Sequence, residues 1–141
     1  DYPEFEDEVN ILKSVQYQHP VTTLEPVISD SKFVELQQDI KDIHVEDKVS
    51  RYIVEIVKAT RKHSDIELGA SPRGSIGLFK MSQAWAAVDG RDYVIPDDIK
   101  DVFHNVLDHR LIIRSDSQLR GIKVTNITDK IIKKIDIPVG V

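Results

Sequence analysis

The chain has 141 residues, of which 40% are hydrophobic and 30% are charged, and these proportions are typical of one globular domain rather than of a membrane protein or a disordered chain. It contains no cysteine, which excludes disulfides, thiolate nucleophiles and cysteine zinc sites. A formal charge of −5 argues against a phosphate polymer as the main partner.

The first 44 residues predict two helices joined by an extended segment. Over residues 5–15, apolar residues recur at helical spacing behind an acidic first turn, which favours a helix. Residues 16–29 contain two prolines and no helical period, so we expect an extended connector there. A second helix is expected from Asp30 or Ser31, either of which is a suitable N-cap, to about residue 44. Its apolar stripe consists of Phe33, Leu36, Ile40 and Ile43.

The middle of the chain predicts two longer helices. Residues 46–62 carry a continuous apolar seam with charged residues opposite. After a loop at residues 63–70, the next helix begins at Pro72 and ends before Gly90, which suits the left-handed residue that follows a helix. Apolar residues, Trp85 among them, surround most of its circumference. We therefore expect this to be the central, most buried helix, with Trp85 in the core.

The last part of the chain predicts two more amphipathic helices. Pro96, followed by two aspartates, favours a helix start. A polar loop is expected at residues 115–121, and the final helix ends before Pro138. The two apolar stripes are Ile99, Val102, Phe103, Val106 and Leu107, then Ile127, Ile131, Ile132 and Ile135. The sequence therefore predicts an all-α protein, a small helical bundle preceded by a helix and an extended connector.

The sequence holds no motif for independent catalysis. Its five histidines include no H-x-x-x-H pair, no serine lies in G-x-S-x-G, and no G-x-x-x-x-G-K-[ST] phosphate loop occurs. We expect no metal site and no nucleotide hydrolysis by this chain alone. No apolar run reaches the roughly 18 residues of a membrane span, and a signal peptide is not recognisable, so we expect a cytoplasmic protein without a membrane span.

One position is physically unusual. Ser71 suits the N-cap and Pro72 the first position of the helix, which places Arg73 second. The helix dipole and the unpaired N–H groups make this end positive, so a cation there is disfavoured unless an anion approaches it. A solvated arginine that tolerates its position is the other interpretation. Small residues surround it and would let a phosphate or another subunit come close to the backbone, namely Gly69, Ala70, Gly74 and Ser75.

Four segments resemble, in order and spacing, the lid domain of MoxR-type AAA+ ATPases. They are Gly69-Ala70-Ser71-Pro72-Arg73, Ala84-Trp85-Ala86, the run from Gly90 through Tyr93-Val94-Ile95-Pro96 to Lys100, and His109-Arg110-Leu111. Tyr2-Pro3 and the acidic helix behind it are similar to the end of that family's nucleotide-binding core. Two departures are Gly74 and Gly77, which stand where helix formers such as alanine are commoner.

The resemblance implies a division of the chain and a role for one residue. Residues 1–44 would be the end of the AAA+ core with its connector, and residues 45–141 the helical lid. Arg73 would be the sensor 2 arginine, which reaches the γ-phosphate of ATP, and Ser71 and Pro72 would join it in nucleotide binding. ATP and Mg²⁺ would be held by a core domain upstream, so the ATPase would be the full-length protein and this fragment alone inactive.

The resemblance also implies partners. The family forms ring oligomers, commonly hexamers, and works in chaperone-like maturation or assembly of client proteins, often with von Willebrand factor A domain partners. No nucleic acid is expected. The alternative from another class is a free-standing helical protein-interaction or DNA-binding module. Its basic surface would comprise Lys58, Arg61, Lys62 and His63 with Lys130, Lys133 and Lys134. Arg91 and Arg110 either face a neighbouring subunit or cap helix ends.

Overall fold

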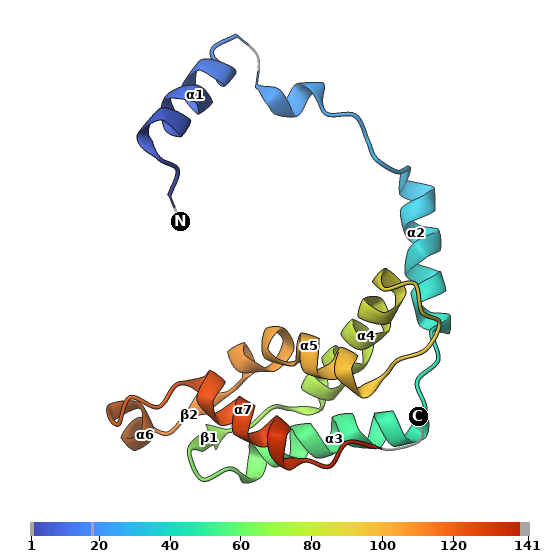
Figure 1. Cartoon of the computed structure of the whole chain (residues 1–141), viewed down its shortest axis with the longest axis vertical. Helices are drawn as coiled ribbons and strands as arrows, with labels where there is room; N and C mark the ends of the chain where they lie inside the picture. Colours follow the sequence, from blue (N-terminus) through green and yellow to red (C-terminus); the bar gives the residue numbers. More distant parts are fainter. Residues whose placement is uncertain (1, 18, 139–141) are drawn as a thin grey trace. The chain divides into compact units, whose positions relative to one another are not determined.

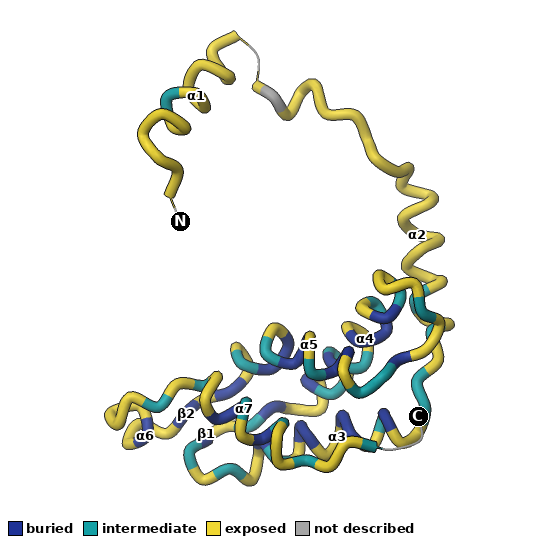
Figure 2. The backbone as a smooth tube through the Cα atoms, in the orientation of Figure 1, coloured by how far each residue is buried: buried dark blue, intermediate teal, exposed yellow. Residues whose placement is uncertain are grey.

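The computed structural model describes residues 2–17 and 19–138, and the chain divides into two compact units between Glu35 and Leu36. The first unit contains α1 (Phe5–Val15) and the short 3₁₀ helix η1 (Pro20–Thr23). The helix is as predicted (Figure 1), and the prediction of an extended connector was wrong for Pro20–Thr23, which form η1. Among the described residues of this unit only Val9 is even half-buried (Figure 2). Its apolar side chains therefore find no core within the unit itself.

The second unit is the helical bundle. Helix α2 (Asp30–Asp39) crosses the boundary between the two units and is followed by η2 (Ile40–Asp42). The bundle then continues through α3 (Asp47–Lys62), β1 (Ile66–Leu68), α4 (Pro72–Val88), α5 (Pro96–Leu107), η3 (Asp108–Arg110), β2 (Ile112–Ile113), α6 (Ser115–Leu119) and α7 (Val124–Lys134). The predicted all-α bundle is confirmed.

Two expected loops contain regular structure. Strand β1 lies within residues 63–70 and pairs antiparallel with β2, so that Ile66 faces Ile113. Both of these side chains are buried, and burial of the pair explains why a short segment far from its partner in sequence is extended. Within residues 115–121, Ser115–Leu119 forms α6. The loop predictions were wrong for these residues.

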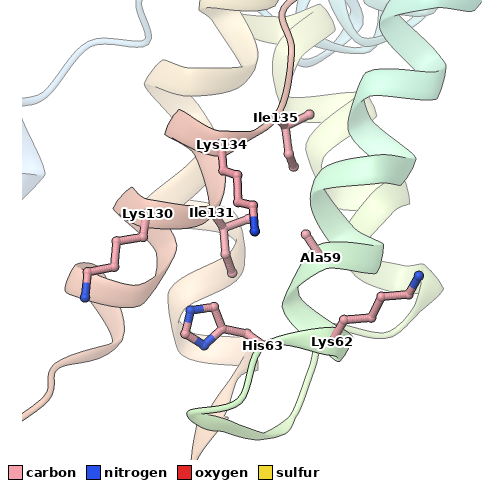
Figure 3. A pocket seen from close by; sticks show the side chains of 7 residues that line it. All are labelled: Ala59, Lys62, His63, Lys130, Ile131, Lys134 and Ile135. Atoms are coloured by element: carbon pink, nitrogen blue, oxygen red, sulfur yellow. The ribbon is translucent and has the colours of Figure 1, made fainter.

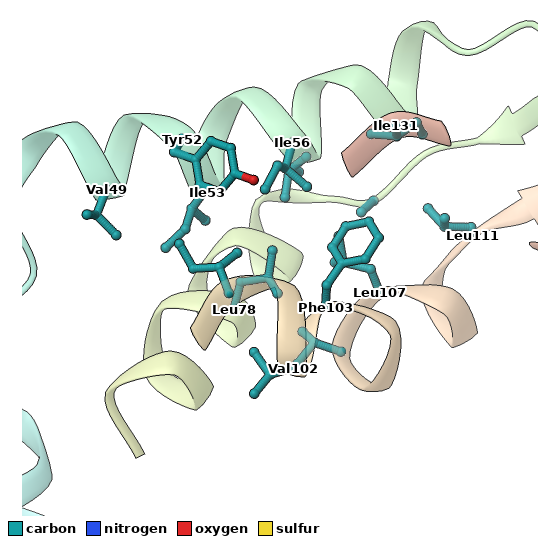
Figure 4. Packing of buried hydrophobic residues seen from close by; sticks show 14 of the residues in the cluster. Val49, Tyr52, Ile53, Ile56, Leu78, Val102, Phe103, Leu107, Leu111 and Ile131 are labelled. Carbon is teal, nitrogen blue, oxygen red and sulfur yellow. The ribbon is translucent and has the colours of Figure 1, made fainter. Parts of the chain in front are cut away.

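The core lies between α3, α4 and α5, with α7 packed against it (Figure 4). Helix α3 contributes one buried face and α5 another, and both match the stripes that the sequence predicts. The buried residues of these faces are Val49, Tyr52, Ile53, Ile56, Val57 and Thr60 from α3, and Ile99, Val102, Phe103, Val106 and Leu107 from α5, where Asp98 is buried as well. Removal of these apolar faces from water is the main stabilising term for the bundle.

Helix α4 is not the most buried helix. Trp85 is 40% exposed, and Ile76, Met81 and Val88 are exposed as well. The buried face of α4 instead carries small residues against α5: a Cβ on Gly74 would lie 3.0 Å from Leu107 Cδ2. The prediction of Trp85 in the core was wrong: Gly74 and Gly77 let α5 approach one face of α4 closely, Leu78 is buried, and Trp85 remains partly exposed.

Asp98 caps the start of α5 and is held by Arg91, and Arg110 caps the end of the same helix. Arg91 donates from Nη1 to Asp98 Oδ2 at 2.8 Å, and the N–H of Ile95 donates to the same oxygen at 2.8 Å. The hydrogen bond that Arg91 donates to Asp98, more than the one it donates to Asp89, raises the pKa of Arg91. Arg110 donates from Nε to the carbonyl of Val106 at 2.8 Å. Of the two roles left open for these arginines, helix capping is displayed by Arg110, whereas Arg91 holds the aspartate that caps the start of α5.

Candidate functional site

The candidate site is the start of α4. The helix begins at Pro72 with Ser71 at the N-cap, as predicted. The Ser71 side chain makes no capping hydrogen bond; instead its carbonyl accepts from the N–H of Gly74 at 2.8 Å. The Ser71 side chain therefore supplies no hydrogen-bond acceptor for the backbone N–H groups at the start of α4.

Arg73 is an exposed cation at this positive helix end. Over residues 2–17 and 19–138, no hydrogen bond or ion pair involves its guanidinium, and no hydrogen bond uses its backbone N–H outside the helix. Other exposed arginines do have acidic partners, as Arg51 has Asp47 at 2.6 Å. An unpaired guanidinium at the N-terminus of a helix is an arrangement that a phosphate oxygen can satisfy.

The residues ahead of Arg73 are fixed to the end of α3. The N–H of Ala70 donates to Thr60 Oγ1 at 3.0 Å, and Arg61 donates from Nε to the carbonyl of Ala70 at 2.7 Å. A Cβ on Gly69 would lie 2.6 Å from the Cα of Arg61. These contacts hold the start of α4 in place, so Arg73 extends from a well-anchored backbone.

Two of the small residues around Arg73, Ala70 and Gly74, serve packing. Ala70 is 1% exposed and Gly74 is buried against Leu107. The expectation that they leave the backbone open to a phosphate was wrong for these residues. What remains accessible for an anion is the guanidinium of Arg73 itself.

A histidine on α5 forms a contact that sequence spacing does not predict. His104 Nδ1 lies 3.1 Å from Asp108 and its Nε2 lies 3.2 Å from Asp129 on α7. The ring also packs edge-on against Phe103. This set joins α5 to α7, and it could not be found from the sequence because Asp129 belongs to another helix. Across the described residues, no group of three or more His, Cys, Asp or Glu side chains forms a metal site.

Four of the seven basic residues considered for a DNA-binding surface do come together. Lys62 and His63 at the end of α3, with Lys130 and Lys134 of α7, line a pocket of about 380 Å³ (Figure 3). Arg61 does not belong to it, because its guanidinium bonds the carbonyl of Ala70. Lys133 faces a different pocket, beside His104 and Asp129.

No helix within the described ranges is long and apolar enough to cross a membrane.

Comparison with known proteins decides the family. The AAA lid domain family matches residues 58–133, a range that includes the end of α3, the Arg73 site and most of α7. The chain belongs to this AAA lid domain family. The resemblance to the lid of MoxR-type AAA+ ATPases is confirmed by named relatives as well as by the family match.

The relatives of this lid are longer proteins. The uncharacterized protein YeaC of Bacillus subtilis is 41% identical over 138 residues, which cover 98% of this chain and 43% of YeaC. Chaperone MoxR1 of Mycobacterium tuberculosis is 30% identical over 97% of this chain and 38% of its own length. The crystal structure of a candidate ATPase from Cytophaga hutchinsonii superimposes with a TM-score of 0.83 and 28% identity, over 98% of this chain and 44% of that one. The chain thus spans less than half of each relative.

Proposed function

We propose that this lid serves a MoxR-type ATPase by supplying Arg73 to ATP as the sensor 2 arginine. The observation that carries the proposal is an exposed arginine, without a protein partner among the described residues, on a helix start that is anchored to α3. Its planar guanidinium matches the geometry of phosphate oxygens. When a γ-phosphate is cleaved, a donor placed at its oxygens stabilises the redistributed negative charge.

Ser71 and Pro72 belong to the same proposed nucleotide site. They set the direction of the first turn of α4 and thereby the reach of Arg73. The proposal assigns Mg²⁺ and the β-phosphate to a nucleotide-binding core upstream, since the sequence contains no G-x-x-x-x-G-K-[ST] loop. Residues 1–44 would then be the end of that core with its connector, and residues 45–141 the lid that moves over the nucleotide.

The wider role follows from the relatives. A protein named as a MoxR chaperone is similar over nearly the whole lid, which supports chaperone-like maturation or assembly of client proteins as the task of the full-length enzyme. We propose that it acts as a ring oligomer, as a hexamer, in the cytoplasm, with ATP hydrolysis coupled to movement of the lid. A von Willebrand factor A domain partner belongs to the same proposal.

The test is ATP hydrolysis by the protein that includes the nucleotide-binding core, compared for wild type, Arg73→Ala and Arg73→Lys. Arg73→Ala removes a donor to the phosphoryl group, so we expect kcat to fall, by as much as about 10³-fold. Arg73→Lys should recover only part of the rate, because a point charge does not reproduce the guanidinium fork. Thermal melts of the same preparations should be unchanged or slightly higher, since the cation sits unfavourably at a helix N-terminus.

Arg114→Ala is the matched control. Arg114 is another exposed arginine at a helix start, where it pairs with Asp116 at 3.5 Å, so its removal should leave kcat unchanged. The proposal is wrong if Arg73→Ala hydrolyses ATP at the wild-type rate, or if its loss of activity follows a loss of folding. In the first case Arg73 is a solvated surface residue.

A further inference from the structure

The pocket between the ends of α3 and α7 combines an apolar floor with a cationic rim. Ala59 comes from α3, and Ile131 and Ile135 come from the last turn of α7 and its C-cap. In Figure 3 these side chains face the space between the two helices, with Lys134 reaching across it and His63 at the end where α3 enters its loop. Lys62 and Lys130 extend to either side of the opening. The volume of about 380 Å³ is enough for one or two apolar side chains.

The charge of this rim is not balanced by the chain. Within residues 2–17 and 19–138, Lys62, Lys130 and Lys134 take part in no ion pair or hydrogen bond of their side chains. The carboxylate of Asp65 interacts electrostatically with Lys130. Its Oδ1, however, already accepts hydrogen bonds from Ser117 at 2.7 Å and from Arg120 at 3.0 Å. The pocket is therefore locally cationic on a chain whose net charge is −5.

Helix dipoles account for only part of this charge. Lys62 and Lys134 end α3 and α7, where a cation is favourable. Lys130 is a full turn further inside α7, and it stands four residues before Lys134 on the same face. Like charges at this spacing repel each other and destabilise a helix. An anion bound between them would remove that repulsion.

We propose that this pocket, defined by Ala59, Lys62, His63, Lys130, Ile131, Lys134 and Ile135, is a docking site for an acidic segment of a partner protein. The segment places an aliphatic or aromatic side chain on the apolar floor and its flanking carboxylates against the lysines. Charge complementarity selects the carboxylates, and the floor selects the apolar side chain. A nucleic acid fits less well, because the cations surround a small aliphatic floor that offers no aromatic stacking surface. This inference does not depend on the role proposed for Arg73.

The test uses the 141-residue chain and three short fluorescein-labelled peptides. The first has one leucine and one phenylalanine set among glutamates and aspartates. In the second the leucine and phenylalanine are replaced by serine, and in the third the acids are replaced by glutamine and asparagine. We expect the first to bind more tightly than either control, and to shift the NMR amide signals of residues 59–63 and 130–135.

Variants of the lysines show where the peptide binds. Lys130→Gln combined with Lys134→Gln should weaken the first peptide by about tenfold, the size expected for two partly exposed ion pairs. Lys133→Gln is the control, because it removes one positive charge from the same helix at a residue that lines the other pocket, and it should bind as wild type does. Thermal melts should show that every variant is folded, since no buried group changes.

Three results would overturn the proposal. One is the absence of signal shifts around the pocket at millimolar concentrations of the first peptide. Another is equal binding of the first and second peptides, which would mean that the apolar floor is not used. The third is tighter, salt-sensitive binding of single-stranded or duplex DNA that the lysine variants abolish, which would assign the surface to nucleic acid instead.

Discussion

Gly69 lies in close contact with the backbone of α3. A substitution at this position therefore tests whether the contact holds the start of α4, where Arg73 lies. A Cβ at this position would lie 2.6 Å from Arg61 Cα and 2.7 Å from Arg61 N, and backbone atoms cannot rotate away as a flexible side chain does. We expect Gly69→Ala to lower the free energy of unfolding by about 1–3 kcal/mol, as overpacking generally does, when measured by urea denaturation.

Ser71→Ala is the control for this measurement. An N-cap serine is commonly worth about 1 kcal/mol, but the Ser71 hydroxyl makes no capping bond here. Its replacement should change stability by no more than about 0.5 kcal/mol. Equal stability of Gly69→Ala and wild type would mean that the contact between Gly69 and α3 is not close in solution.

Asp65 joins two elements that are far apart in sequence, the loop before β1 and helix α6. Its Oδ1 accepts from Ser117 Oγ at 2.7 Å, and its carbonyl accepts from the N–H of Arg114 at 3.0 Å. The hydrogen bond from Ser117 lowers the pKa of Asp65, with smaller contributions from Arg120, His63 and Lys130. The folded state therefore holds the Asp65 proton less tightly than the unfolded state does.

The pH dependence of stability follows from this direction. Because the unfolded chain binds the proton more readily, the stabilisation by Asp65 is complete above the unfolded value of about 3.9 and is lost as the pH falls through the lower folded pKa. We expect Asp65→Asn to unfold at lower urea concentration than wild type at pH 7, and the difference to narrow below about pH 3.9. Asp116→Asn, an exposed acid on α6, is the control. A difference that stays constant with pH would contradict the assignment.

Among the helices, periodicity predicted the buried face where polar residues occupy the opposite side. Helices α3 and α5 have such two-sided patterns, and their predicted stripes are buried. Helix α4 has apolar residues almost all round, so periodicity could not choose a face. The choice was made by side-chain size, since Gly74 and Gly77 allow Leu107 and Val106 to approach closely.

For the molecule as a whole, we expect the 141-residue chain to unfold cooperatively and to hydrolyse no ATP. The unit from Leu36 onward contains the continuous apolar core that cooperative unfolding requires. The sequence contains no phosphate loop to hold the β-phosphate. Thermal melts and a phosphate-release assay on the same pure sample test both statements. Phosphate release above background would place the ATPase within this chain and would refute the proposed division of labour.

The sequence by itself determined the helix starts and ends that are marked by residues close to them in the chain. A serine and a proline mark the start of α4 and thereby single out Arg73 at a positive helix end, and Gly90 ends the same helix with a φ of +74°. These features depend on neighbours a few residues away, so no tertiary knowledge is needed to predict them. The order and spacing of four short segments were likewise sufficient for the resemblance to the AAA lid.

Only the tertiary structure decided which residues meet across the chain. It pairs β1 with β2, exposes Trp85, and brings Lys62 beside Lys130 and Lys134. It also shows that Gly69 and Ala70 pack against α3 and that Gly74 packs against α5. None of these contacts has a local signal, because the free energy of each depends on a partner distant in sequence and on which faces the whole bundle covers.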